Sequence, residues 1–281
     1  MVLESVLQSR FALHHPLAMV LYGIIITSVS IAVSLATFAE YASILTIALI
    51  TIGTVPLLYR VLSHEERVEA QKPKNPLTFF GRHFHLIKIY AFLFIGFILA
   101  FSFWYVSLHG TGQENAFREQ EKTWQQISGL RGNATGTTQN ILNNCGSSEF
   151  WPLALDCIFA NNAIVLGWSL VLSFFFGAGA IFLVAWNASV IGVVLGHEFL
   201  SNSFLPALGT AVGLLPHGLP EIMAYFIGAI AGGIISVAVA RKKHLTDEWK
   251  TISKDVFVMV VAAVVLLFFA ALLEAALLLN P

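Results

Sequence analysis

The sequence predicts an all-α membrane protein, a polytopic bundle of about seven transmembrane helices. Of its 281 residues, 57% are hydrophobic and only 11% are charged. Several apolar runs approach or exceed the ~20 residues that a helix needs to cross a bilayer. A soluble domain of this length would carry far more surface charge. The net charge of −1 gives no sign of a nucleic-acid partner. We therefore expect the lipid bilayer as surroundings, with a homo-oligomer or other membrane proteins as partners.

The apolar runs divide the chain into seven expected spans. These cover residues 16–39, 41–62, 86–108, 158–186, 188–212, 220–240 and 256–279. The stretch 188–220 leaves room for a broken or re-entrant helix, because Gly218 and Pro220 favour a turn. These spans divide the chain into three parts. Residues 1–108 form an N-terminal three-span region with a basic loop, residues 109–157 form a polar loop, and residues 158–281 form a C-terminal membrane core.

The positive charges predict the orientation. Eleven of the fifteen Lys and Arg residues, six in one group and five in the other, cluster around residues 60–88 and 241–254. Loops rich in Lys and Arg stay in the cytoplasm, and the four spans between these two loops return the chain to the same side. We therefore expect a cytoplasmic N-terminus, with the loop 109–157 and the C-terminus outside the cell membrane.

The outer loop contains the only two cysteines, Cys145 and Cys157. An even pair in an oxidising compartment predicts a disulfide bond, which would tie the loop to the start of the fourth span. The alternative is two unpaired thiols, one of them buried in that span.

Paired glycines mark the C-terminal half. Residues four apart share a helix face, so a G-x-x-x-G spacing lets another backbone approach closely. This pattern predicts tight packing within the bundle, or a dimer face, and it indicates no chemistry. The glycines concerned are Gly192 with Gly196, Gly209 with Gly213, and Gly228 with Gly232, together with Gly177 and Gly179.

Polar residues inside the apolar segments are the candidate functional residues, because they are costly at membrane depth. His217 and Glu221 stand four apart around Pro220. In one interpretation Pro220 and Glu221 start the sixth helix, since proline suits the first helical position and a carboxylate suits the first turn. In the other, His217 and Glu221 form a functional polar site. The remaining candidates are Asn161 and Asn162 at the start of the fourth span, Asn187 at its end, and His197 with Glu198 in the fifth.

We expect no cofactor. The alternative is a metal ion held by His217 and Glu221. Zinc usually takes three or four ligands, and His197-Glu198 forms only the first half of an H-E-x-x-H motif. No Ser or Cys lies in a nucleophile motif such as G-x-S-x-G. The sequence therefore predicts no catalytic residues.

Several of these residues together resemble the stage II sporulation protein M family, also called DUF95. The resemblance covers about residues 155–240. It is carried by Asn161-Asn162, Gly177-x-Gly179, Asn187, Gly192, Leu195-Gly196 and Leu215-Pro216-His217-Gly218-x-x-Glu221-x-x-Ala224. One departure is Ala188, where a glycine often follows the asparagine.

The resemblance implies a polytopic membrane protein without catalytic activity. The bacterial namesake resembles a membrane scaffold that works with peptidoglycan-degrading partners, although the family also occurs in organisms that never sporulate. Three functions stay open: a non-enzymatic scaffold or assembly factor, which we expect first; a channel or transporter with a polar path near Asn187, His217 and Glu221; and a metal-dependent intramembrane hydrolase. A water-accessible cavity joining His217 to Asn187 would favour transport.

Overall fold

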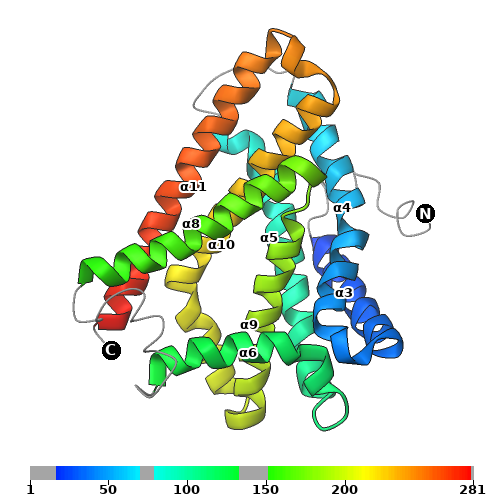
Figure 1. Ribbon diagram of the computed structural model, residues 1–281, viewed down its shortest axis with the longest axis vertical. Helices are drawn as coiled ribbons and strands as arrows, with labels where there is room; N and C mark the ends of the chain where they lie inside the picture. The colour runs from blue at the N-terminus through cyan, green and yellow to red at the C-terminus, as the bar shows by residue number, and fades with distance from the viewer. Residues whose placement is uncertain (1–16, 70–78, 133–150, 280–281) are drawn as a thin grey trace.

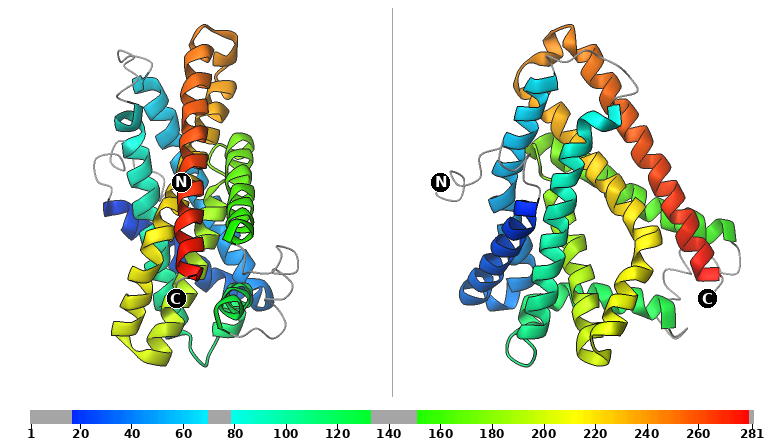
Figure 2. Two further views of the ribbon diagram at one scale, coloured as in Figure 1. Left: turned by 90° about the vertical axis from the view of Figure 1, so that its left-hand side faces the viewer. Right: turned by 180° about the vertical axis from the view of Figure 1, so that it is seen from behind.

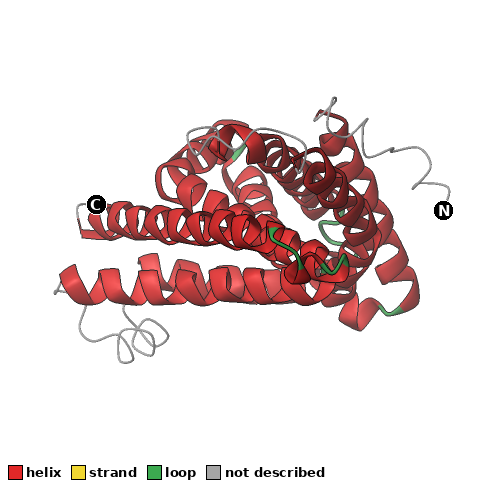
Figure 3. Ribbon diagram, turned by 90° about the horizontal axis from the view of Figure 1, so that it is seen from above, coloured by secondary structure: helices red, strands yellow, loops and turns green. Residues whose placement is uncertain are grey.

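The computed structural model describes residues 17–69, 79–132 and 151–279, and the regular structure of these ranges is entirely helical (Figure 1). The all-α class is therefore confirmed. Seven of the described helices are long and apolar enough to cross a membrane, which confirms the expected number of spans. Figure 3, coloured by secondary structure, shows helices joined by short loops and no strand among the described residues. The elements are α3 Leu17–Thr37, η1 Ala39–Tyr41, α4 Ala42–Glu69, α5 Phe79–Ser107, α6 Gln113–Gly132, α8 Trp151–Phe176, α9 Ile181–Asn202, α10 Phe204–Ala240, η3 Lys243–Leu245 and α11 Glu248–Leu279.

The boundary between the fourth and fifth spans differs from the expected one at residue 187. Helix α8 ends at Phe176, and α9 begins at Ile181. Gly177 follows α8 with a φ of 72°, a left-handed conformation that glycine adopts without steric penalty and that commonly ends a helix. Asn187 does not interrupt α9, because its Nδ2 donates a hydrogen bond to the Leu183 carbonyl within the same helix, at 2.8 Å.

The expected break between residues 212 and 220 is also wrong. Helix α10 runs without interruption over 37 residues, with Pro216 and Pro220 inside it. Membrane helices tolerate proline because neighbouring groups satisfy the freed backbone carbonyls. The chain instead reverses at Ser203, whose φ is 85°. This turn lies inside the stretch 188–220, and the helices on either side of it, α9 and α10, are each long and apolar enough to span a membrane.

Helix α5 is central to the N-terminal half, where it packs against α3 and α9. Gly23 of α3 and Gly96 of α5 face each other, and a Cβ added to Gly23 would lie 2.9 Å from the Leu93 carbonyl oxygen. The Trp104 indole also donates to the Ser28 hydroxyl at 2.8 Å. A close backbone approach and a polar contact thus hold α3 against α5, as in other membrane helix pairs.

Helix α6 lies within the range 109–157 and extends across one end of the bundle (Figure 1). Its Phe117 is fully buried, and the Phe117 ring centroid lies 5.3 Å from that of Tyr105 on α5. The Tyr105 hydroxyl donates to the Glu121 carboxylate at 2.9 Å. The apolar face of this otherwise polar helix is therefore packed against the membrane helices.

The described parts of the two cation-rich regions lie at the opposite end. The Arg241 guanidinium, just after α10, donates to the Ser63 carbonyl of α4 at 3.0 Å. Figure 2 shows the end of α4 and the turn between α10 and α11 at the same end of the molecule in both views. An even number of crossings between the two regions agrees with this arrangement.

Candidate functional site

The candidate site is a group of polar side chains where α8, α10 and α11 meet. We call it the polar cluster, and its members are Asn161 and Asn162 of α8, Glu221 and Tyr225 of α10, and Glu274 of α11. Glu221 and Tyr225 are four residues apart in a continuous helix, so their side chains share one face. They occupy the middle of the 37-residue helix α10, far from both of its ends.

Tyr225 links α10 to α8. Its hydroxyl lies 2.7 Å from Glu221 Oε1 and 3.2 Å from Asn162 Oδ1. A phenol has one proton to donate, and the shorter distance marks Glu221 as its main acceptor. Asn161 Nδ2 donates to Asn162 Oδ1 at 3.3 Å. The chain of contacts therefore runs from the α10 carboxylate to the amides of α8.

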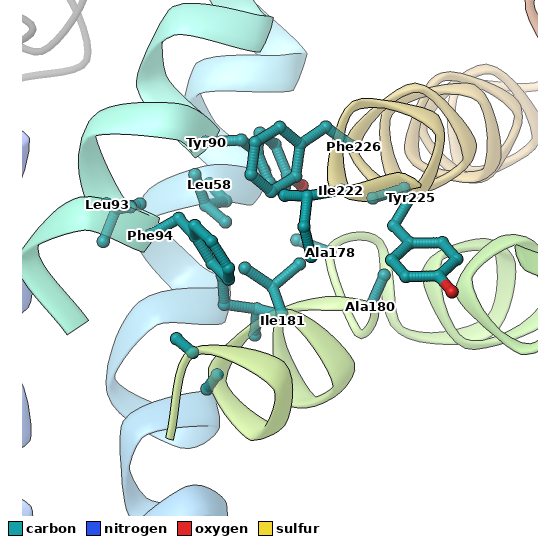
Figure 4. Packing of buried hydrophobic residues seen from close by; sticks show 14 of the residues in the cluster. Leu58, Tyr90, Leu93, Phe94, Ala178, Ala180, Ile181, Ile222, Tyr225 and Phe226 are labelled. Atoms are coloured by element: carbon teal, nitrogen blue, oxygen red, sulfur yellow. The ribbon is translucent and has the colours of Figure 1, made fainter. Parts of the chain in front are cut away.

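The surroundings of Tyr225 differ from those of its neighbour Phe226. Phe226 packs against α5, with its ring centroid 5.7 Å from that of Tyr90 and 5.7 Å from that of Phe94. Figure 4 shows Phe226 and Ile222 turned toward these rings, while Tyr225 turns to the other side of α10. One face of α10 thus belongs to the hydrophobic core and the other to the polar cluster.

A second carboxylate completes the cluster. Glu274 of α11 lies close enough to act electrostatically on both Glu221 and Tyr225. Two carboxylates in a region of low dielectric constant repel each other more strongly than in water. The arrangement therefore sets two acidic groups, one on α10 and one on α11, within electrostatic range of each other.

His217 lies one turn before Glu221 in the same helix and is buried, with 7% of its surface exposed. Because α10 begins at Phe204, the interpretation that the helix starts at Pro220 is wrong. The condition for His217 and Glu221 to share a face is met, since they stand four apart in one continuous helix.

The other predicted polar residues lie on α9, with partners elsewhere. The Asn187 amide bonds within its own helix, as described above. The His197 ring faces Trp124 of α6, with the ring centroids 6.3 Å apart. The Glu198 carboxylate accepts a hydrogen bond from Asn202 at 2.9 Å. The structure thus brings Asn161, Asn162 and Glu221 together, whereas Asn187, His197 and Glu198 lie apart from that group.

A cavity of about 350 Å³ lies between α5, α9 and α10. Its walls are apolar, with Phe94, Ile191 and Leu219 among them, and they include neither Asn187 nor His217. This cavity therefore does not provide the polar connection between those two residues that a transport path would use.

Glycines hold α10 close to α8. A Cβ added to Gly228 would lie 2.5 Å from Leu166 Cδ1, and one added to Gly232 would lie 2.5 Å from the Leu170 carbonyl oxygen. Gly192 and Gly196 meet α5 in the same way, and Gly179 meets the carbonyl of Leu172 on α8. By contrast, Gly209 and Gly213 have no heavy atom within 4 Å of an added Cβ.

Neither Tyr225 nor Glu274 is among the candidate site residues that the sequence predicted. The available signal for Tyr225 was its spacing of four from Glu221 inside an apolar run, since a buried tyrosine hydroxyl usually finds a hydrogen-bond partner. No pattern in α11 shows which neighbour Glu274 approaches, because that depends on how α11 packs.

The family model described as stage II sporulation protein M matches residues 89–277, which is more than half of the chain. The chain belongs to the stage II sporulation protein M family. The matched range contains every residue of the polar cluster. Searches of curated proteins and of solved structures give no significant match.

In this stage II sporulation protein M family member, the part of the chain that the structure describes contains no group of three or more His, Cys, Asp or Glu residues placed to hold a metal ion. Cys157 is disulfide-bonded. Cys145, the other cysteine of the sequence, lies outside the described residues, so its pairing with Cys157 stays a prediction.

Proposed function

We propose that this protein is a non-enzymatic membrane scaffold, in which α8, α10 and α11 act as one rigid unit. Two kinds of contact support this proposal. Tyr225 joins α10 to α8, Gly228 and Gly232 bring these two helices into close contact, and α11 packs against both. Polar links and small residues are the interactions that hold membrane helices together where the hydrophobic effect cannot.

The observation that carries the proposal is the outward exposure of two helices of this unit. Only 22% of the apolar window of α8 and 33% of that of α11 is buried inside the chain, compared with 67% for α10. A rigid unit that keeps two helices largely uncovered offers a fixed surface to partner helices in the membrane. The proposal requires neither a cofactor nor a catalytic residue.

We also infer that the end of the bundle holding Ser63 and Arg241 faces the cytoplasm. The described parts of the two cation-rich regions meet there, and positively charged loops are retained on that side. The N-terminus would then be cytoplasmic, and α6 and the C-terminus would lie on the outer side.

The scaffold proposal is tested by comparing Glu221→Gln with Glu40→Gln. Glu40 lies in the exposed turn η1 and serves as the control. We expect the tagged wild-type chain to migrate in a defined complex larger than itself after mild solubilisation of native membranes. Glu221→Gln should lower the amount of this complex severalfold, because a hydrogen bond to a charged group contributes about 1.5–3 kcal/mol, while Glu40→Gln should leave it unchanged. Equal tolerance of both substitutions, at matched amounts of folded chain, would contradict the proposal.

Transport is the second candidate function, and one observation favours it. The Glu221 carboxylate lies in the middle of a membrane helix with Glu274 in electrostatic range, and intramembrane acids often mark ion or proton pathways. The purified chain in liposomes distinguishes the two functions. Proton or alkali-cation flux that exceeds protein-free vesicles and is lost in Glu221→Gln supports transport, whereas a scaffold gives no such flux.

A further inference from the structure

One face of α8 is left uncovered by the other described residues of the chain. Asn161, Ile164, Trp168, Val171 and Phe175 recur at alternating spacings of three and four residues and are all exposed. Residues at these spacings share one side of a helix. We call this side the outer face of α8.

The opposite side of α8 carries the contacts with α10. It contains Asn162, Leu166, Ser169 and Ser173, all of which are buried. Figure 1 shows α8 crossing α10 and α11 obliquely, and Figure 2 shows it at the margin of the molecule. The outer face therefore points away from every helix with which α8 packs.

Asn161 makes this face unsuited to lipid alone. Its neighbour Asn162 contacts Tyr225 in the middle of α10, so Asn161 lies at a similar depth. Its side chain is exposed, and the one hydrogen bond that it makes among the described residues uses a single amide hydrogen. The second amide hydrogen and the carbonyl oxygen of Asn161 would then face lipid hydrocarbon, which offers neither a donor nor an acceptor. An unsatisfied polar group is costly in such surroundings.

A second asparagine satisfies both groups at once. A primary amide is both donor and acceptor, so two copies related by a twofold axis can exchange a pair of hydrogen bonds. Asparagine at a helix interface is known to fix register and oligomeric state, and polar side chains drive the association of membrane helices. The large apolar side chains of Ile164 and Trp168, 62% and 56% exposed, flank the amide and supply packing area.

We propose that the outer face of α8 is the interface of a homodimer, in which Asn161 of one copy bonds to Asn161 of the other beside the twofold axis. The dimer does not depend on the function proposed above, because a scaffold and a transporter could both form it. Other membrane proteins and lipid are the competing occupants of this face.

Cross-linking in lipid vesicles that contain only the purified chain tests the contact. Ile164→Cys places a thiol one turn from Asn161, and Ile52→Cys on α4 is a matched control with 68% exposure. With a short bifunctional thiol reagent we expect a covalent dimer from Ile164→Cys and none above the wild-type background from Ile52→Cys. A chain that stays monomeric in both variants, or that cross-links equally in both, overturns the proposal.

The role of the amide is tested by energy transfer between labelled copies as the ratio of protein to lipid is varied. Asn161→Leu should raise the dissociation constant of the dimer about 3- to 30-fold, the range expected for one polar contact between membrane helices. Asn161→Gln keeps an amide and should retain most of the association. An Asn161→Leu chain that dimerises as tightly as the wild type overturns the proposal.

Discussion

Substituting Gly232 by alanine is expected to destabilise the protein by about 1–3 kcal/mol, the range for a group forced into a packed interior. An added Cβ would lie 2.5 Å from the Leu170 carbonyl oxygen and 2.8 Å from Ser173 Cβ. The first of these atoms belongs to the backbone of α8, which cannot move aside without displacing the helix. Helix α8 would therefore have to separate from α10.

The matched control is Gly209→Ala in the same helix, where an added Cβ meets nothing within 4 Å. Alanine favours a helix over glycine by about 1 kcal/mol, so this variant should be as stable as the wild type or slightly more stable. Gly228→Ala should fall between the two, because its nearest atom is the flexible end of the Leu166 side chain. The measurement is the thermal unfolding midpoint in mild detergent. A Gly232→Ala midpoint equal to that of Gly209→Ala would contradict the close contact between α8 and α10.

The sequence predicts this architecture well where long-range packing is not needed. Apolar length alone gives the seven spans, and the distribution of Lys and Arg places two loops at one end, where Arg241 meets Ser63. The turns are harder to predict. Pro216 and Pro220 look like a break but lie inside α10, while the actual reversal at Ser203 has no glycine or proline at the turning residue.

The polar cluster shows the same division between local pattern and tertiary packing. Glu221 and Tyr225 are linked by a spacing of four, which the sequence displays once α10 is known to be continuous. The approach of Asn162 and Glu274 depends on how α8 and α11 cross α10, and no local pattern specifies that. Asn187 shows the converse, because a polar residue that looks functional in an apolar run bonds within its own helix.

Replacing Tyr225 by phenylalanine is expected to destabilise the folded protein by about 1–3 kcal/mol, the cost of leaving a buried acceptor unsatisfied. The variant keeps the ring and removes the hydroxyl that Glu221 and Asn162 share. Tyr90→Phe is the control of identical chemistry. The Tyr90 hydroxyl is buried and has no hydrogen-bond partner among the described residues, so its removal should be neutral or stabilising. Equal losses of stability in the two variants would mean that the Tyr225 hydroxyl has no special role.

A double-mutant cycle then separates the link between Tyr225 and Glu221 from general packing. Glu221→Leu removes the acceptor, so Tyr225→Phe in that background no longer leaves the carboxylate unsatisfied. The double variant should therefore lose less stability than the sum of the single variants, with a coupling energy of about 0.5–3 kcal/mol. A coupling near zero would show that the carboxylate and the phenol act independently. A clear coupling would show that the contact between Glu221 and Tyr225 stabilises the protein. Because Tyr225 also contacts Asn162 of α8, a proton or cation bound at Glu221 would then affect how α10 is held against α8.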